Sequence, residues 1–446
     1  MDLIRRVSSF SPISYGLTLL SLLIAVILLG ILQVHKSYTK QVSPEGCRRI
    51  GLQGRSNLAD HQDLRYSSGS NPGISLDGTP LWRVKALFIY PIKSCRRIEL
   101  DHGEIIRTGM KYDRQFCFAQ QVTSLPSSEE NKDGSHTVKS EWNFITQRTF
   151  ARMAKVETEM WIPDPSSPTY SPNAEFVKSD GCIVMRFPFS PDVDLSWSGV
   201  KALASLIAAK LYGQSEPMVE QCIPFNPSLD RIKEKGYTSE KMKIWKDAPE
   251  ALNMGAEMPE DVMAKLKYSL GVTNPLTLFR IDTQKYREVF KCAPKKQDVG
   301  YQIIIGMADS YPLHIMNLAS VHDVASKIPK GYYKEFNPLR YRANVYITGP
   351  PAFAEDSWAK ARIGDCNYHI SCRTTRCKLP NVDPETAIRD RVEPEKTMRS
   401  YRVVDKGSSS ACLGMQVTPL VEETGEISVG DEVKLLEQGE HFFLKV

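Results

Sequence analysis

Short runs of β-branched and aromatic residues, separated by turn residues, recur along most of this 446-residue chain. Runs of this kind are typical of strands, and the Gly-Asp pairs at 364–365 and 430–431 are typical of tight turns directly before a strand. No repeat with a period of about 20–50 residues is found, so a repeat architecture is not expected. The expected strands lie within 81–92, 115–120, 142–146, 182–187, 301–305, 343–348, 367–371 and 432–436. This pattern predicts β-barrels with a few helices packed outside them.

Three other segments have a different character. One helix is expected at 200–212, with apolar residues on one face and Ser198 available as an N-terminal cap. Residues 215–300 are charged and interrupted by prolines, and we expect mixed helix and loop there. The polar residues at 124–136 predict a surface loop.

The N-terminus carries a long uncharged stretch. From Val7 to Val34 there is no charged residue, and 16–34 is almost wholly apolar. Because roughly 20 helical residues cross a bilayer core, this stretch predicts a transmembrane helix over about residues 15–34. A signal peptide is the alternative, but its apolar region usually has only about 7–15 residues and ends in a small-residue cleavage site, which is missing here. More Lys and Arg residues follow the stretch than precede it, which predicts a body facing the cytosol.

Composition and charge exclude one class of partner and favour one compartment. The hydrophobic fraction of 41% and the charged fraction of 24% are ordinary for a folded protein. The net charge of +5 is spread along the chain with no basic–aromatic module, so nucleic acid is not expected as a partner. Ten thinly spread cysteines and the absence of an Asn-x-Ser/Thr acceptor site favour a reducing compartment.

The densest group of reactive side chains lies at 371–386, where Cys372 and Cys377 stand beside three cations. Cations next to a thiol stabilise the thiolate, which is a nucleophile and a ligand for soft metals. Both residues could instead be buried structural cysteines. The spacing lacks the paired cysteines of zinc and iron–sulfur sites, so neither is expected. The three cations are Arg373, Arg376 and Lys378.

Further basic residues predict an anion site. Arg340 and Arg342 stand at alternate positions of 337–344 and are expected on one face of a strand. With Lys93 of Tyr-Pro-Ile-Lys-Ser-Cys and Arg114 of Lys-Tyr-Asp-Arg, they could bind a phosphate, since arginine forks match phosphate oxygens. Each segment alone could equally be a solvated surface.

No other catalytic pattern competes with these clusters. The chain has no G-x-S-x-G, H-E-x-x-H, P-loop or G-x-G-x-x-G motif. His314, His322 and His369 are isolated in the sequence, so we expect each to be a satisfied core or surface histidine.

Taken in order, the clusters resemble a known family. In the first half, the segments 90–95, 112–114 and 145–148 resemble the N-terminal β-barrel domain that accompanies MOSC domains. In the second half, the segments 342–344, 353–358, 363–365, 375–377, 382–386 and 400–402 resemble the MOSC domain itself. The resemblance covers about residues 81–190 and 300–440, and the closest branch looks like the mitochondrial amidoxime-reducing component. Residues 190–300 match poorly and could shape a substrate pocket.

The resemblance implies a β-rich α+β fold of two β-barrel-like domains with peripheral helices, preceded by a single transmembrane helix. It also implies a single-pass membrane protein of the mitochondrial outer membrane, with the endoplasmic reticulum as the alternative. The expected parts are an N-terminal membrane anchor at 1–40, a flexible linker at 41–80, a MOSC N-terminal β-barrel domain at 81–195, a helical or irregular connecting region at 196–300 and a MOSC domain at 301–446.

Carried over position by position, the resemblance implies a molybdenum cofactor with a pyranopterin, and Cys377 as the metal ligand and catalytic residue. A soft thiolate suits molybdenum, and basic residues suit the pterin phosphate. The implied cofactor-binding residues are Lys93, Ser94, Arg114, Ser310, Tyr311, Arg342, Asn344, Thr375 and Arg376.

The implied activity is the reduction of small N-hydroxylated compounds, namely amidoximes and hydroxylamines, to the N–H form. Because the chain has no haem, flavin or iron–sulfur motif, the implied electron donors are a b-type cytochrome and its flavin-dependent NADH reductase. The alternative is a sulfur-carrier or cofactor-binding MOSC protein with a persulfide on Cys377, since MOSC domains also occur fused to pyridoxal-phosphate cysteine desulfurases. A third possibility is a membrane-tethered binding module without redox turnover. Metal content separates the first two hypotheses.

Overall fold

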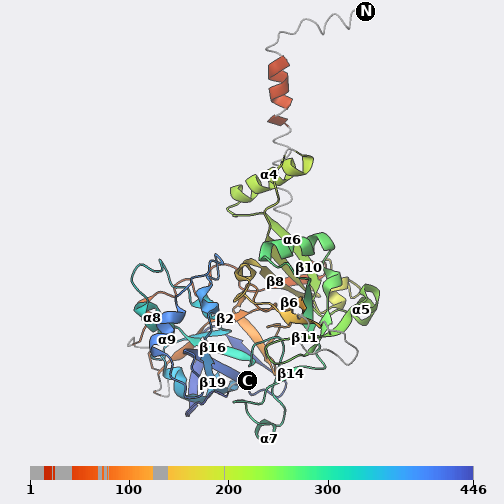
Figure 1. The fold of residues 1–446 in the computed structure, drawn as a ribbon. Helices are drawn as coiled ribbons and strands as arrows, with labels where there is room; N and C mark the ends of the chain where they lie inside the picture. Colours follow the sequence, from red (N-terminus) through yellow and green to blue (C-terminus); the bar gives the residue numbers. More distant parts are fainter. Residues whose placement is uncertain are drawn as a thin grey trace, which may run out of the picture. The chain divides into compact units, whose positions relative to one another are not determined.

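The computed structural model describes residues 15–22, 24–25, 43–68, 73–74, 78, 80–123, 139–194 and 196–444. The chain divides into two compact units, one formed by 1–44 with 188–219 and the other by 45–187 with 220–446. The larger unit contains two closed β-barrels, and Figure 1 labels some of their strands.

Seven strands close the first barrel in the order β17-β16-β20-β19-β18-β22-β2, because β17 also pairs with β2. β2 pairs with β17 along one edge, and with β22 and then β3 along the other. Phe88, Tyr346 and Leu413 of this part of the chain are fully buried in one hydrophobic cluster, which also includes residues of helices packed against the strands. The strands are β2 (Trp82–Ile89), β3 (Ile98–Leu100), β16 (Leu313–Asn317), β17 (Val345–Thr348), β18 (Trp358–Ile363), β19 (Cys366–Thr375), β20 (Cys412–Pro419) and β22 (Glu432–Gln438).

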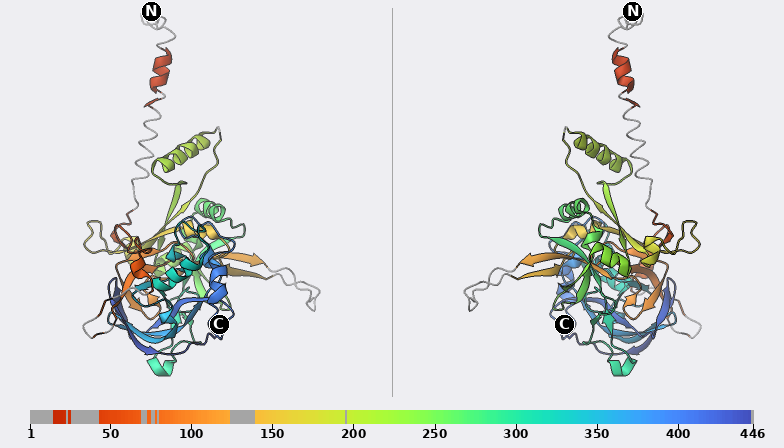
Figure 2. Two further views of the ribbon diagram at one scale, coloured as in Figure 1. Left: turned by 90° about the vertical axis from the view of Figure 1, so that its left-hand side faces the viewer. Right: turned by 90° about the vertical axis from the view of Figure 1, so that its right-hand side faces the viewer.

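Five strands close the second barrel in the order β11-β12-β13-β6-β7. Its core includes Cys117, Met242 and Phe279, and Trp142 packs against them. Figure 2 shows the paired strands β6 and β7 extending away from this barrel. The strands are β6 (Phe116–Thr123), β7 (Ser140–Phe144), β11 (Thr238–Lys243), β12 (Glu250–Asn253) and β13 (Leu276–Ile281).

Smaller sheets and helices complete the fold. β1 (Cys47–Ile50), β8 (Glu157–Pro163), β9 (Cys182–Pro188) and β10 (Met218–Pro224) form one sheet, and β21 (Thr424–Ser428), β4 (His102–Ile106) and β5 (Gly109–Met110) form another. β14 (Arg287–Glu288) pairs with β15 (Ile304–Ile305). The helices are α3 (Glu175–Lys178), α4 (Trp197–Leu211), α5 (Leu229–Lys235), α6 (Glu260–Leu270), α7 (Lys296–Val299), α8 (Leu318–Lys327) and α9 (Glu395–Tyr401).

The predicted barrels are confirmed, and each expected strand segment contains a strand. The barrels nevertheless draw on more of the chain than the sequence indicated. The expectation of helix and loop at 215–300 is wrong for β11, β12 and β13, which complete the five-strand barrel. β11 reads Thr-Ser-Glu-Lys-Met-Lys and buries only Met242 fully, so it lacks the apolar alternation by which strands are recognised. The domain boundaries expected from the sequence stay a prediction.

The transmembrane helix is a wrong prediction. Among the described residues no helix is long and apolar enough to cross a membrane. Residues 15–22 and 24–25 are helical, which is fewer than the roughly 20 residues that a bilayer core requires. The rest of the expected span lies outside the described residues, as does the expected loop at 124–136. The fold class is therefore corrected to two barrels with helices, and the single-pass membrane assignment, in either organelle, is withdrawn.

A smaller correction concerns the one helix expected from the sequence. α4 begins at Trp197, and the side chain of Ser196, not Ser198, accepts the capping hydrogen bond from the Gly199 N–H. An N-cap residue accepts from an N–H two or three positions later, so the cap moves with the first helical residue.

A buried carboxyl group ties the turn before β18 to the start of α8. Glu355 lies in the 3₁₀ turn Ala354–Ser357 and is fully buried. Its carboxyl oxygens accept hydrogen bonds from the Ser320 hydroxyl at 2.6 Å and from the Asn317 amide at 3.0 Å. Burial raises the pKa of Glu355 to about 7, because these neutral partners do not compensate a buried charge.

We therefore expect the protein to lose stability as the pH rises from about 4.5 through about 7. A glutamate with a raised folded-state pKa contributes stability that is fully present below its unfolded pKa and is lost as the pH passes its folded pKa, roughly 3 kcal/mol in all. Urea unfolding at pH 5 and pH 8 measures the change for the wild type and for Glu355→Gln. The variant should show the smaller change, and an identical pH dependence would contradict the assignment.

Candidate active site

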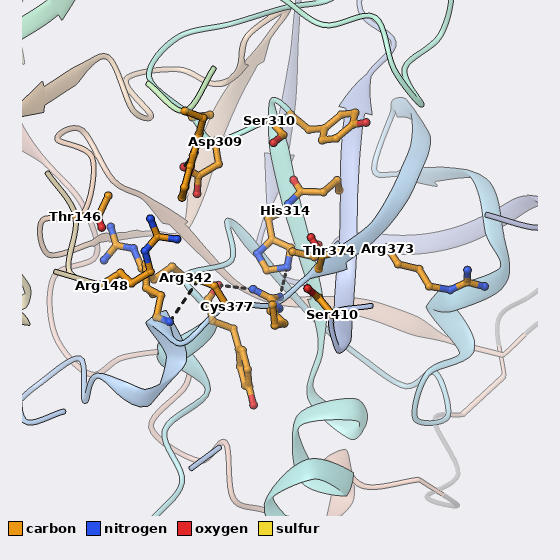
Figure 3. Close-up of a pocket in the computed structure, with 18 of the residues that line it drawn as sticks. Thr146, Arg148, Asp309, Ser310, His314, Arg342, Arg373, Thr374, Cys377 and Ser410 are labelled. Carbon is orange, nitrogen blue, oxygen red and sulfur yellow. Dashed lines mark hydrogen bonds between the residues drawn. The ribbon is translucent and has the colours of Figure 1, made fainter. Parts of the chain in front are cut away.

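A cavity of about 910 Å³ lies in the larger unit, where strand ends and loops of both barrels meet. Figure 3 shows His314 and Cys377 between Arg148 and Arg342 on one side and Arg373 on the other. The structure brings all ten residues expected at the site to this one cavity, although their roles stay a prediction. They are Lys93, Ser94, Arg114, Ser310, Tyr311, Arg342, Asn344, Thr375, Arg376 and Cys377.

Unusual backbone conformations help to place three of these residues. Ser94, Arg114 and Arg342 have φ angles of 64°, 47° and 52°, in the left-handed region that non-glycine residues seldom adopt. Such conformations each cost on the order of 1 kcal/mol and persist where the surrounding structure enforces them, commonly at functional sites. Three separate loops hold this conformation around the same cavity.

Cys377 is the exposed cysteine of the chain, and the other nine are buried or half-buried. It follows the end of β19, and its Sγ accepts a hydrogen bond from the Leu379 N–H at 3.4 Å. Cys372, by contrast, is fully buried in a hydrophobic cluster and does not line the cavity. Of the two neighbouring cysteines, only Cys377 can present its sulfur to a bound molecule.

Four of the cavity's cations are paired with carboxylates. Arg287 pairs with Asp247 at 2.6 Å and Arg373 with Asp405 at 3.2 Å, and the pairs of Lys93 and Arg114 lie next to residues expected at the site. The Lys93 ammonium donates to Asp309 at 2.5 Å and to the Met307 carbonyl at 2.8 Å. Arg114 donates to Asp113 at 2.5 Å and to the Asn344 side chain at 3.1 Å. Burial lowers the pKa of Lys93. Enclosure would raise the pKa of Asp309, but the Lys93 charge and the hydrogen bonds outweigh it and hold that pKa below its usual range.

Three other guanidinium groups of the cavity form no ion pair with a carboxylate in the described parts of the chain: Arg148, Arg342 and Arg376. Arg342 donates to the Cys95 carbonyl at 2.9 Å, and Arg376 donates to the Leu413 and Tyr341 carbonyls at 2.9 and 3.3 Å. Burial lowers the pKa of Arg342 and lowers that of Arg376 to about 10, so both remain charged at neutral pH. The cavity thus holds positive charge that suits an anion.

His314 holds one of these arginines. It is buried and hydrogen-bonded, as expected, but it also lines the cavity. Its Nε2 accepts from Arg376 at 2.7 Å. Burial and the Arg376 charge lower the pKa of His314 well below its usual value, so the ring stays neutral and remains an acceptor.

Arg340 and Tyr311 contribute to the site differently from what the sequence predicted. The expected strand at 337–344 is a 3₁₀ turn over Pro338–Tyr341, followed by β17. Arg340 is consequently buried, pairs with Asp383 at 2.7 Å and does not line the cavity, so its expected contribution to the anion site is wrong. Tyr311 lines the cavity, but its hydroxyl donates to the Lys291 carbonyl at 2.5 Å.

Several cavity residues were missed in the sequence. Thr146 and Arg148 belong to the Ile-Thr-Gln-Arg motif that carries part of the resemblance, and Asp309 directly precedes Ser310, so both signals were present. No sequence signal indicated Trp245, because it lies in a lysine-rich turn of the segment that matches the family poorly.

The barrels, the cavity and the motifs agree with the comparison with known families. The model of the MOSC N-terminal beta barrel domain matches residues 81–170, and the model of the MOSC domain matches residues 303–434. The chain therefore contains the two domain types that these models describe, an N-terminal beta barrel domain followed by a MOSC domain.

Comparison with individual curated proteins finds similarity to mitochondrial amidoxime-reducing components. Mitochondrial amidoxime reducing component 2 of Rattus norvegicus is 33% identical over 180 residues, which cover 39% of this chain and 51% of that relative. Mitochondrial amidoxime-reducing component 1 is 36% identical over 140 residues in Mus musculus and 34% identical over 139 residues in Homo sapiens. These two matches cover 30% of this chain, and 39% and 40% of the relatives. The chain thus spans about half or less of the relatives it matches.

Removing Arg114 should destabilise the fold more than removing Arg342. Arg114→Ala leaves the Asp113 carboxylate, only 2% exposed, without its ion partner, which typically costs about 3–5 kcal/mol. Arg342→Ala removes one hydrogen bond and a cation–π contact with Tyr90, together about 1–2 kcal/mol. The free energy of unfolding in urea measures both, and equal losses would contradict the structural role of Arg114.

Proposed function

We propose that the cavity binds a pyranopterin molybdenum cofactor with Cys377 as the metal ligand, and that the protein reduces small N-hydroxylated compounds. The proposal rests on one observation. The exposed thiol of Cys377 lies in the same cavity as three guanidinium groups that have no carboxylate partner in the described parts of the chain. A soft thiolate is suited to molybdenum, and guanidinium groups are suited to a phosphate.

The residues present fit a metal that arrives with most of its own ligands. Within the described ranges, no group of three or more His, Cys, Asp or Glu side chains could hold a metal ion. The cofactor would bring its dithiolene sulfurs, so that a single protein ligand suffices. Arg342 and Arg376 would hold the phosphate, and the side chains of Ser94, Asn344 and Thr375 would hydrogen-bond the pterin.

When bound, the cofactor supplies a redox centre that accepts the substrate oxygen. The reaction takes up two electrons and two protons and releases the oxygen as water. Within the cavity, Asp309 stays ionised beside Lys93 and His314 stays neutral, so both serve at neutral pH as hydrogen-bond acceptors that orient their partners rather than as acids. A b-type cytochrome and a flavin-dependent NADH reductase are the proposed electron donors, on the strength of the family resemblance alone.

The test compares the two neighbouring cysteines. Cys377→Ala should abolish amidoxime reduction, because the metal loses a ligand that water or hydroxide replaces poorly. Cys372→Ala should keep most activity and lose only the packing of a small apolar side chain, on the order of 1 kcal/mol. Molybdenum content, pterin content and reduction with artificially supplied electrons are measured for both variants and for the wild type.

The possible results separate the hypotheses. A molybdenum-free wild-type protein with a persulfide on Cys377 would support the sulfur-carrier alternative. A molybdenum-loaded protein without turnover of any N-hydroxylated compound would support a binding module. An active Cys377 variant beside an inactive Cys372 variant would show that the ligand is wrongly assigned.

A further inference from the structure

The segment between the two family matches supplies one wall of the cavity. Neither family model reaches residues 171–302, yet Trp245, Lys246, Asp247 and Arg287 of that segment line the cavity. Trp245 lies in the tight turn between β11 and β12, where Ile244 pairs with Asp247. This wall therefore comes from a part of the chain that neither family model covers.

Trp245 is held in place from three sides. Its backbone has a φ of 55°, a conformation that bulky residues rarely adopt. Its indole N–H donates to Asp309 at 3.0 Å, and Asp309 is itself held by Lys93. The Phe144 ring packs edge-on against the indole, with centroids 5.0 Å apart. The indole therefore has a defined orientation before any molecule binds.

Part of this indole nevertheless stays exposed, and Trp245 lines the cavity. Trp245 is 42% exposed. The Arg148 guanidinium lies over the indole, 4.5 Å from the ring centroid, and donates no hydrogen bond to the described residues. Figure 3 shows Arg148 on the side of the cavity where Thr146 and Arg342 lie. An ordered aromatic surface beside a planar cation is suited to a flat aromatic ring.

We infer that Trp245 and Arg148 form a stacking wall that selects N-hydroxylated substrates with an aromatic ring over aliphatic ones. The inference rests on the proposed function. An aryl amidoxime can place its ring against the open part of the indole, in an offset-stacked or edge-on arrangement, while its N-hydroxyl group points toward Cys377. An aliphatic amidoxime presents the same reacting group but has no ring for the wall to contact.

The test uses the full-length, cofactor-loaded protein with benzamidoxime and acetamidoxime as substrates. Trp245→Ala should raise KM for benzamidoxime by about 10-fold, since an aromatic pair contributes up to about 1.5 kcal/mol, while kcat stays near the wild-type value. KM for acetamidoxime should change by less than about 2-fold. Trp245→Phe should keep most of the preference, and Trp197→Ala, at another exposed tryptophan, is the matched control.

Binding of the products gives a second readout without turnover. Calorimetry should show weaker benzamidine binding to Trp245→Ala, by a similar factor, and unchanged acetamidine binding. Equal effects on the aromatic and aliphatic compounds, or loss of molybdenum from the variant, would overturn the inference while the proposed function stands. A wild-type protein that reduces neither compound would overturn both.

A separate observation concerns two cysteines beside the cavity. Cys372 of β19 is fully buried, and half-buried Cys292 packs against the same cluster, which also contains Tyr311. The two thiols interact side chain to side chain although they are 80 positions apart in sequence, and contact with Cys372 lowers the pKa of Cys292 to about 6. Cys292 also accepts a hydrogen bond from the Leu444 N–H at 3.4 Å, next to Phe443, which lines the cavity.

We propose that Cys292 and Cys372 form a reversible disulfide with a small-molecule disulfide as oxidant. The Cys292 thiolate attacks the oxidant's S–S bond and releases one thiol. The Cys372 sulfur then loses its proton, attacks the mixed disulfide and releases the second thiol. The two protein thiols thereby transfer two electrons to the oxidant, and the new bond joins the segment after β14, which contacts the C-terminal segment at Leu444, to β19.

Oxidised glutathione added to the full-length protein, followed by alkylation and peptide mapping, tests this proposal independently of any activity. A linked Cys292–Cys372 peptide should form and should disappear on reduction with dithiothreitol. Cys292→Ser should abolish it, and Cys222→Ser, at the other half-buried cysteine, should not. A protein that is glutathionylated at Cys377 without forming the linked peptide would overturn the proposal.

Discussion

The Asn344 side chain connects the segments on which the cavity depends. Its amide donates to the Phe88 carbonyl of β2 at 3.1 Å, and its oxygen accepts from Arg114 at 3.1 Å and from the His314 backbone at 3.2 Å. The residue is fully buried, so each unmade bond would leave a polar group without water, at about 1–3 kcal/mol. This one amide fixes the first strand of the barrel against the strand that carries His314.

The position of Cys377 follows from the same connection. Because His314 is fixed, its ring can accept a hydrogen bond from Arg376. The Arg376 guanidinium also donates hydrogen bonds to the carbonyls of Tyr341 and Leu413. Arg376 directly precedes Cys377, so the thiol is placed by a chain of hydrogen bonds that begins at β2. The closed barrel is thus a condition for the site, because the pairing of β2 with β17 brings Lys93 and Ser94 to the cavity that Cys377 also lines.

The sequence predicted the strands and barrels well, because short β-branched and aromatic runs bounded by turn residues carry a local signal. It also predicted a set of residues that the fold brings to one cavity. It failed where the deciding contact is long-range. β11 was not recognised because only Met242 of this strand is fully buried. Nothing local to Arg340 indicates that it pairs with Asp383 and does not line the cavity. Nothing local shows that Trp245 lies against Arg148, although Thr146 and Arg148 stood in a motif that was recognised.

The central claim is that the Cys377 thiolate coordinates molybdenum. X-ray absorption at the molybdenum edge counts the sulfur neighbours of the metal and tests this claim most directly. The account predicts that Cys377→Ala, compared at equal molybdenum content, loses one sulfur neighbour relative to the wild type, whereas Cys372→Ala keeps the wild-type count. An unchanged sulfur count in Cys377→Ala, or a wild-type protein that holds no molybdenum, would contradict it.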